Sequence, residues 1–421
     1  MPVHEGYTLM PRILLLFPTR TYRAPDFMRA AERLGVDVVV ASEEASSLAE
    51  KNPAGLLALD FHRPDEAARV VTAFAQRYPI DAVIGVDDDT AMVAAQIAAA
   101  LGLPHNSVES TRAARYKDLM RRLLARAGVP GPQFWVFSLD DDPRVLAEQV
   151  AYPCVLKPTF LAASRGVIRA DGKSEFLAAF RRIEAILHDP DVIARDARAA
   201  RRILVESYIP GHEVALEGLL VGGELRLLAL FDKPDPLEGP YFEETMYVTP
   251  SRHSPDSQSA IIECVARAAQ ALGLKEGPVH AELRINEEGP QVIEIAARSI
   301  GGLCSRTLRF GTGLSLEEII IRHALGLDIA SLHRERRAAG VMMIPIPRAG
   351  ILREVRGIED ARAVPGIEDI TITAHLGQRL IPLPEGSRYL GFIFSRADAP
   401  ERVEAALRQA HSRLTFIISD E

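Results

Sequence analysis

Two glutamates in neighbouring strand-like segments could hold a metal ion between them. Glu282 lies in residues 279–285 and Glu294 in residues 291–296, and a five-residue polar loop joins the two segments. If they form a simple hairpin, with the last residue of the first segment paired to the first residue of the second, Glu282 faces Glu294. Opposed like charges are destabilising unless a proton or a cation lies between them. Oxygen ligands suit Mg²⁺ or Mn²⁺, and Mg²⁺ usually binds together with substrate phosphates, so the pair predicts a metal site beside a nucleotide.

A lysine at the end of another strand-like segment could bind phosphate. Lys157 is followed by residues 159–167, a loop that contains several small residues. Backbone amides of such a loop can approach phosphate oxygens while the lysine supplies a point charge. The alternative is a solvated lysine before an ordinary hairpin turn.

Residues 206–213 could form the hinge that a purine base needs. The segment runs from a strand end into a turn set by Pro210 and Gly211, and then into another strand. Exposed backbone groups there could read the adenine edge, and Glu213 could accept hydrogen bonds from ribose hydroxyls. The alternative is a connector between two lobes that carries surface acids.

Arg298, four residues after Glu294, could stabilise charge on a phosphoryl group during its transfer. The alternative is a surface arginine that neutralises the two glutamates. Cys304 has no recognisable base beside it, so a buried thiol is favoured over a nucleophile. Residues 231–250 form a long, polar stretch interrupted by prolines, which we expect to be a loop that shapes the acceptor pocket.

The first hundred residues show the alternation of strands and helices that predicts a parallel sheet. Polar segments follow two of the strands, at residues 18–20 and 87–89, where open α/β sheets bind ligands. The expected strands are 13–17, 36–40 and 82–86, and the clearest helix is 90–101.

The rest of the chain divides into three further segments. A helix beginning beside Lys117, strands near 134–137 and 152–157, and a charged helical region before strand 202–206 predict a small α+β lobe. A larger lobe would carry the glutamate hairpin. The tail shows several strand-like runs and one amphipathic helical segment, which predict a separate small α/β module. Its expected elements are strands 341–346, 370–373, 389–394 and 414–418, and helix 400–413.

Composition restricts the setting in which the protein acts. A chain of 421 residues with 48% hydrophobic and 25% charged residues predicts a soluble protein of several domains. A net charge of -8 argues against nucleic-acid binding. Three distant cysteines indicate neither disulfides nor zinc, and neither a signal peptide nor an apolar run of about 20 residues is present, so we expect a cytoplasmic protein without membrane contact.

Five separated motifs, taken in order, resemble those of the ATP-grasp superfamily. They are Lys117, the loop at Lys157 with Ser164 to Val167, residues 206–213, residues 280–282, and residues 294–298. The forms around Lys157 and Arg298 look closest to the L-amino-acid ligases that join two amino acids. The resemblance implies an α/β fold class with a Rossmann-like domain (1–109), a small ATP-grasp lobe (110–206), a large lobe with the metal site (207–330) and a C-terminal α/β module (331–421).

The resemblance also implies a role for each residue that matches a motif. Lys117 and Lys157 would hold the phosphates of ATP, and Ser164, Gly166 and Val167 would belong to the loop that closes over them. Glu206, Tyr208 and Ile209 would line the adenine, and Glu213 would meet the ribose. Glu282 and Glu294 would carry Mg²⁺ or Mn²⁺, and Arg298, with Lys157, would act in catalysis. Many members have asparagine where this chain has Ala296.

The implied reaction is ATP-dependent ligation of a carboxylate to an amine through an acyl phosphate, with small-molecule partners that are amino acids. A carboxylate does not acylate an amine usefully at neutral pH, so the phosphoryl group would supply the leaving group. One alternative is a phosphotransferase whose phosphorylated product is final. Another is a nucleotide-binding regulator without catalysis, which Ala296 makes conceivable. The C-terminal module could cover the site or mediate a homodimer.

Overall fold

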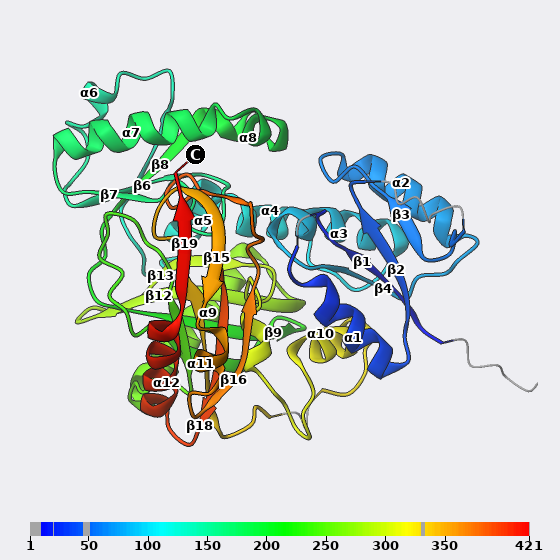
Figure 1. Ribbon diagram of the computed structural model, residues 1–421. Coiled ribbons are helices and arrows are strands. Elements are labelled where there is room, and N and C mark those ends of the chain that lie inside the picture. Colours follow the sequence, from blue (N-terminus) through cyan, green and yellow to red (C-terminus); the bar gives the residue numbers. More distant parts are fainter. Residues whose placement is uncertain (1–9, 20, 45–50, 330–332, 421) are drawn as a thin grey trace, which may run out of the picture.

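The computed structural model describes residues 10–19, 21–44, 51–329 and 333–420. Arg20, the last residue of one polar segment expected at a strand end, lies outside them. Figure 1 shows an N-terminal domain, in blue, set beside a larger body. A small lobe with a long helix lies across the top of that body, and the C-terminal strands and helix lie along its front.

The N-terminal domain is a parallel four-stranded sheet in the order β3-β2-β1-β4. The sequence predicts β1, β2 and β4 within one or two residues, but it gives no sign of the three-residue β3. Asp87 caps α3, because its side chain accepts hydrogen bonds from the N–H groups of Asp89 and Thr90. The elements are β1 (Arg12–Leu16), α1 (Ala24–Leu34), β2 (Asp37–Ser42), β3 (Leu56–Ala58), α2 (Pro64–Ala75), β4 (Ala82–Gly85) and α3 (Asp88–Leu101).

The small lobe has its own antiparallel sheet, in the order β5-β8-β6-β7, and its own apolar core. Helices α4 (Val108–Arg115) and α5 (Lys117–Arg126) pack instead against α9 and the large sheet. The part with a separate core is therefore smaller than the predicted lobe. Its elements are β5 (Phe134–Ser138), α6 (Pro143–Leu146), β6 (Cys154–Pro158), β7 (Ile168–Ala170), α7 (Lys173–Leu187), α8 (Pro190–Arg195) and β8 (Arg202–Ser207).

The large lobe and most of the C-terminal segment share one eight-stranded sheet, in the order β13-β12-β9-β10-β11-β14-β18-β16. The C-terminal segment is therefore joined to the large lobe by main-chain pairing: β11, a buried strand inside the stretch expected to be a loop, pairs with β14 and joins the two halves. The large-lobe elements are β9 (His212–Val221), β10 (Glu224–Asp232), β11 (Met246–Thr249), α9 (Pro255–Leu272), β12 (Gly277–Asn286), β13 (Gly289–Ala296) and α10 (Leu316–Ala324).

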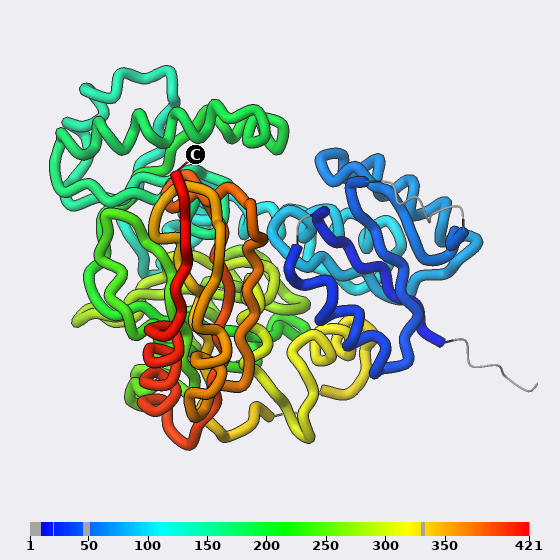
Figure 2. Tube along the Cα trace, viewed as in Figure 1, coloured from blue at the N-terminus to red at the C-terminus, as the bar shows by residue number. Residues whose placement is uncertain are grey.

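The C-terminal segment completes that sheet and adds a second, three-stranded one in the order β17-β15-β19. Helix α12 has the bounds that the sequence predicts, with Pro400 in its first turn. Figure 2 traces the chain through these strands, whose upper ends lie beside the small lobe. The elements are β14 (Ala338–Ile344), β15 (Gly350–Arg356), α11 (Ile358–Arg362), β16 (Ile367–Ile372), β17 (Arg379–Leu380), β18 (Gly391–Ala397), α12 (Pro400–Arg413) and β19 (Thr415–Ser419).

One apolar core joins three of the four parts of the molecule. It contains Phe27 of the N-terminal domain, Phe231 and Ile320 of the large lobe, and Phe392 of the C-terminal segment, all of them buried. Burying side chains of this size is worth about 1.5–3 kcal/mol each, so these parts are held together strongly. The small lobe has no buried residue in this core.

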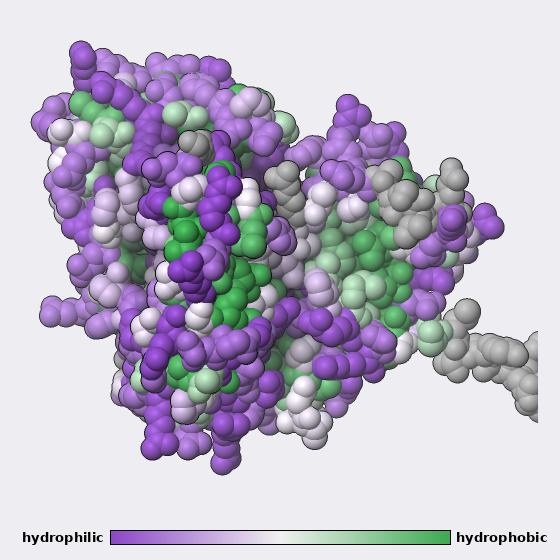
Figure 3. Space-filling view, in the orientation of Figure 1, coloured by the Kyte–Doolittle hydropathy of each residue, from purple (hydrophilic) through white to green (hydrophobic). Residues whose placement is uncertain are grey.

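The face of the molecule seen in Figure 3 is mostly hydrophilic, with green patches over the C-terminal strands and the N-terminal domain. Large apolar side chains exposed on the C-terminal segment include Leu376, Ile381 and Ile417. Within the described ranges, none of the helices combines the length and the apolar character needed to cross a bilayer.

Candidate active site

Side chains from all four parts of the chain line one cavity of about 320 Å³. Every predicted site residue except Gly166 lies on its wall, although these residues are spread over more than 180 positions of the sequence. The predicted residues on the wall are Lys117, Lys157, Ser164, Val167, Glu206, Tyr208, Ile209, Glu213, Glu282, Glu294 and Arg298.

The two glutamates of the hairpin are cross-strand partners, as the sequence predicts, but the details of the hairpin differ. The loop has two residues rather than five, because Asn286 pairs with Gly289 and accepts a hydrogen bond from the N–H of Glu288. The expected pairing of Ile285 with Gln291 is therefore wrong by one residue. A β-bulge between Glu282 and the next pair restores the alignment with Glu294, and it leaves Ile293 as the extra residue.

Lys157 is buried and forms an ion pair, so the alternative of a solvated lysine is wrong. Its Nζ lies 2.6 Å from a carboxylate oxygen of Glu206, and Arg121 donates to the other oxygen of the same carboxylate. Burial would raise the pKa of Glu206, but the charges of Arg121 and Lys157 outweigh it and lower that pKa to about 2. Arg121 also donates to the backbone oxygen of Val292 at 2.7 Å, and so links this cluster to β13.

Lys117 reaches the opposite side of the cavity from the first turn of α5. Its Nζ lies 2.9 Å from Oε1 of Glu294 and 3.0 Å from the backbone oxygen of Leu161. A single lysine therefore contacts both a predicted metal ligand and the start of the predicted phosphate loop.

The loop after Lys157 has an unusual backbone. Ala163 and Ser164 have φ values of 54° and 55°, a left-handed conformation that non-glycine residues seldom adopt. Gly166 has a φ of 75°, and a Cβ there would lie 2.7 Å from Pro158. The glycine is thus needed for the path of the loop, although it does not line the cavity.

Aromatic and cationic side chains surround the predicted adenine end. The ring of Tyr208 stacks near Phe242, with the guanidinium of Arg169 4.1 Å from its centroid. Arg284 donates to the Tyr208 hydroxyl at 2.9 Å and to the backbone oxygen of Ile209 at 3.0 Å. These contacts fix the hinge segment next to the cavity.

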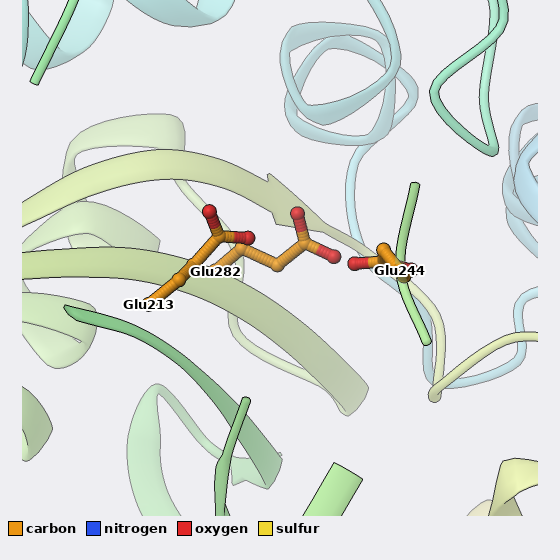
Figure 4. Close-up of side chains that lie close together, drawn as sticks. All are labelled: Glu213, Glu244 and Glu282. Atoms are coloured by element: carbon orange, nitrogen blue, oxygen red, sulfur yellow. The ribbon is translucent and has the colours of Figure 1, made fainter. Parts of the chain in front are cut away.

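Three glutamates lie close together beside the cavity (Figure 4), and one lysine contacts all of them. Carboxylate oxygens of Glu213, Glu244 and Glu282 all lie within 4.8 Å of one another. Lys233 Nζ lies 2.7 Å from Glu213 and 3.5 Å from Glu282, and it also contacts Glu244. Burial would lower the pKa of Lys233, but the three carboxylates raise it well above its usual value. The lysine is therefore a charged counter-ion for a cluster that Glu294 does not join.

Glu282 is held from a second side by a histidine. His280 lies 3.1 Å from Glu217 through Nδ1 and 3.5 Å from Glu282 through Nε2. Burial would lower the pKa of His280, but its hydrogen bonds to Glu217 and Glu282 raise it to about 9. Burial would likewise raise the pKa of Glu282, yet Lys233 and His280 lower it to about 2, so Glu282 is an anion.

Arg298 pairs with the N-terminal domain rather than with the two glutamates. Its guanidinium lies 2.9 Å from Asp88, and only 14% of its side chain is exposed, so the alternative of a surface arginine is wrong. The next residue, Ser299, accepts a hydrogen bond of 2.6 Å from Arg23, which precedes α1. Two arginine contacts therefore bind the segment after β13 to the first domain.

A further part of the cavity wall carries a mixture of acidic, aromatic and apolar groups. They include Glu244, Tyr247, Met343 and Tyr389. Burial and the charge of Glu282 raise the pKa of Glu244. Cys304 also lies here, is buried and has its pKa raised by burial, which agrees with the expected inert thiol.

Several residues at or behind the cavity wall were not assigned a role because no local pattern marks them. Arg121 looks like an ordinary charged residue on the polar face of a helix, and Lys233 and Glu244 lie in a stretch with no readable period. Their contacts join positions 11 to 172 residues apart. For Asp88, the partner of Arg298, a signal was available: it follows a strand end where open α/β sheets bind ligands.

Comparison with known families supports the order of the motifs. A model described as an ATP-grasp domain matches residues 150–307, and one described as an ATP-grasp N-terminal domain matches residues 28–105. Together these two cover more than half of the chain. The model of the L-amino acid ligase C-terminal domain 2 matches residues 342–419.

Individual relatives are distant but consistent with one another. The structure of an L-amino acid ligase from Bacillus licheniformis is 27% identical, with a TM-score of 0.80 over 97% of this chain and 99% of that one. Alanine–anticapsin ligase of Bacillus subtilis is 26% identical over 62% of this chain, and human carnosine synthase 1 is 27% identical over 68%. The alignments cover 58% and 36% of these two curated relatives, less than two thirds of their length.

These matches confirm the predicted α/β architecture of a Rossmann-like domain followed by a two-lobed clamp and a C-terminal segment. The chain belongs to the ATP-grasp superfamily and is similar to its L-amino acid ligases.

Proposed function

We propose that this protein is an ATP-dependent carboxylate–amine ligase that joins two amino acids through an acyl phosphate and releases ADP and phosphate. The observation that carries the proposal is that residues from all five motifs face one cavity, in a chain that aligns over almost its whole length with an L-amino acid ligase. Two of the curated relatives are named as an alanine–anticapsin ligase and a carnosine synthase, which agrees with ligation.

In this proposal the nucleotide lies between the small lobe and the large sheet. Tyr208 and Ile209 line the adenine, together with Glu206 of the same hinge. Lys117 and Lys157 face the phosphates, and the loop with Ser164, Gly166 and Val167 covers them. Glu213, which contacts Lys233 at 2.7 Å and Arg284 at 3.0 Å, is oriented by both cations beside the ribose position.

The donor set fits a hard divalent cation. Glu282 and Glu294 are paired across the hairpin, both line the cavity, and each already contacts a lysine, which indicates that their negative charge needs a cation. Mg²⁺ or Mn²⁺ held by these two carboxylates and by ATP phosphates would reduce the charge of the triphosphate. Ala296 offers no side-chain ligand, so the phosphates or water complete the coordination.

The reaction needs two displacements. A carboxylate oxygen of the first substrate attacks the γ-phosphorus of ATP, the bond to the β-phosphate oxygen breaks, and ADP leaves. The amine of the second substrate then attacks the acyl carbon, loses a proton, and phosphate leaves as the amide bond forms. Arg298 stabilises the charge on the transferring phosphoryl group, and Lys157 neutralises the phosphates.

We propose that the acyl-donor amino acid occupies the part of the cavity lined by Glu244, Tyr247 and Tyr389. The Glu244 carboxylate there is partly buried, and Lys233 and Tyr247 both donate to one of its oxygens, so the other oxygen offers an acceptor for a substrate ammonium group. The ring walls offer apolar contact to a side chain of limited size, because the cavity as a whole encloses about 320 Å³.

The direct test is to supply ATP, Mg²⁺ and pairs of amino acids, and to measure released phosphate together with ligated product by mass spectrometry. We expect both in equal amounts for at least one pair. A stable phosphorylated product formed without any amine would select the phosphotransferase alternative. ATP binding without ADP formation across a broad panel would select a non-catalytic regulator.

We also propose that two copies of the chain pair through the C-terminal segment. The support is the set of large apolar side chains that this segment exposes, of which Leu376 is 67% exposed. Light scattering should give the mass of a dimer, and Leu376→Asp should reduce it to that of a monomer. A monomeric wild type would exclude this pairing.

A further inference from the structure

The predicted phosphate loop is hydrogen-bonded to a segment more than 200 residues further along the chain. The N–H of Gly166 donates to the backbone oxygen of Pro384 at 2.8 Å. The guanidinium of Arg165, the preceding residue, donates to the backbone oxygen of Glu385 at 2.9 Å. The C-terminal segment thus reaches across to the small lobe, where the upper ends of β15 and β19 lie in Figure 1.

An arginine on the long helix of the small lobe makes a second connection to the same place. Arg182, on α7, donates through Nη2 to the Glu385 carboxylate at 2.9 Å and through Nε to its other oxygen. It also donates to the hydroxyl of Tyr241, and its guanidinium lies 5.1 Å from the centroid of that ring. One side chain therefore bridges the small lobe, the C-terminal segment and the excursion before β11.

The neighbouring edge of the small lobe is held in the same way. Arg169 donates from its backbone N–H to the oxygen of Pro240 at 2.9 Å and from its guanidinium to the oxygen of Glu238 at 2.6 Å. These contacts are polar. They contrast with the apolar core shared by the other three parts, to which the small lobe contributes no buried residue.

This distribution has a mechanical consequence. The small lobe has its own core and is joined to the rest largely by hydrogen bonds and ion pairs. Besides the contacts at Glu385, these include Arg195 with Asp89 and Arg121 with Glu206. Polar contacts of this kind can break and re-form as the lobe moves. The Arg182–Glu385 pair is exposed, with 41% of each side chain accessible, so it adds little to global stability. Its two parallel hydrogen bonds do hold the Glu385 segment in one position relative to α7. Because that segment is hydrogen-bonded to the phosphate loop, the pair also restricts the position of the loop.

We propose that Glu385 and Arg182 are positioning residues that keep the phosphate loop closed over ATP while the acyl phosphate exists. The inference rests on the proposed function, because only a reaction with a water-sensitive intermediate needs such closure. Neither side chain touches the reacting atoms. The Glu385 side chain acts through the backbone of its own segment, because the backbone oxygens of Glu385 and Pro384 accept hydrogen bonds from Arg165 and Gly166. The neighbours of these two residues in the loop, Ser164 and Val167, line the cavity.

The test compares Glu385→Gln with Asp140→Asn. Asp140 forms another exposed pair in the small lobe, with Arg201, and does not touch the loop. In Glu385→Gln we expect the KM for ATP to rise about 3- to 5-fold, the factor that an exposed pair can supply. We also expect phosphate release to exceed ligated product, because water reaches the intermediate. Asp140→Asn should keep the wild-type KM and the wild-type ratio of ligated product to released phosphate. We call this ratio the coupling, and Glu385→Asp should recover part of the coupling that Glu385→Gln loses.

A second readout does not depend on catalysis. Hydrogen–deuterium exchange of residues 159–169 should be faster in Glu385→Gln than in the wild type, both without ligand and with Mg²⁺ and a non-hydrolysable ATP analogue, at an unchanged melting temperature. Equal exchange and equal coupling in the two proteins would overturn the inference. A wild type that turns over no ATP would refute the proposed function instead, while the exchange experiment would still decide whether Glu385 holds the loop.

Discussion

The guanidinium of Arg298 lies 2.9 Å from the carboxylate of Asp88, the first residue of α3 in the N-terminal domain. Burial would lower the pKa of Arg298, but the charges of Asp88 and Glu294 raise it, so the group is always cationic. Asp88 of the first domain therefore orients a cation at the cavity, whose proposed metal ligands, Glu282 and Glu294, belong to another part of the chain. Relative movement of these parts would misplace the arginine.

Arg298→Lys should lower kcat by about 100- to 1000-fold, the effect of removing one preorganised donor to transition-state charge, with little change in the KM for ATP. Asp88→Asn should give a smaller loss, because Arg298 keeps its charge but loses the partner that orients it. Steady-state phosphate release with a ligated amino-acid pair measures both. Arg267→Lys, an exposed change on α9, is the control. A kcat above half of the wild-type value in Arg298→Lys would show that the arginine has no such role.

Glu294→Gln and Glu282→Gln should each abolish turnover at ordinary Mg²⁺ concentrations, because an amide is a weaker ligand for a hard cation than a carboxylate. Titration with Mg²⁺ or Mn²⁺ should show a large increase in the concentration needed for half-maximal activity. Glu287→Gln is a matched control, since this exposed glutamate lies in the loop of the same hairpin. Unchanged metal dependence in the first two variants would remove these residues from the metal site.

Lys233→Met should destabilise the fold by about 3–5 kcal/mol at pH 7, because it removes the cation that three partly buried carboxylates share, leaving Glu213 with Arg284 and Glu282 with His280. The folded-state pKa of Glu282 is lowered, so its stabilising contribution is complete above its ordinary pKa of 4.5 and is lost as the pH falls towards 2. The deficit of the variant should therefore shrink in acid. Urea unfolding at pH 7 and pH 4 measures it, with the exposed Lys275→Met as control. An equal deficit at both values would mean that packing, not charge, explains the loss.

Glu206→Gln should remove the centre of the Arg121–Glu206–Lys157 cluster. The pKa of Glu206 falls from 4.5 to about 2 on folding, which corresponds to a stabilisation of about 3 kcal/mol present above pH 4.5 and lost on acidification. The variant should thus be less stable at neutral pH and approach the wild type near pH 3. Thermal unfolding across this range gives the comparison. Because Lys157 loses its partner, the KM for ATP should also change, whereas an unaltered KM would separate this cluster from nucleotide binding.

Much of the architecture could be read from local patterns. The parallel strands of the first domain and helix α12 follow from apolar runs and from proline at a helix start, because these signals act within a few residues. The pairing of Glu282 with Glu294 follows from alternation within an assumed hairpin. The assumed loop is longer than the real one, and the pairing is nevertheless correct because a β-bulge shifts the register by one residue. The position of such a bulge depends on tertiary packing, so it cannot be predicted from the periodicity of the sequence.

The site was less readable where its contacts are distant. Motif residues such as Lys157 and Arg298 were found because each lies at the end of a strand. Lys233 and Glu244, by contrast, come next to Glu213 and Glu282 only because β9, β10 and β12 lie side by side in the sheet. The sheet shared by the large lobe and the C-terminal segment was not foreseen for a related reason: the four-residue strand β11 is too short to stand out, yet it connects two halves of that sheet.

That short strand limits how the protein can be taken apart or recombined. A chain cut near residue 330 would keep β11 and lose β14, and would thereby expose the backbone edge and the buried side chains of Met246, Tyr247 and Val248. Unprotected apolar edges invite intermolecular pairing. Chimaeras that exchange whole C-terminal segments between relatives should consequently aggregate unless the donor brings a compatible neighbour for β11.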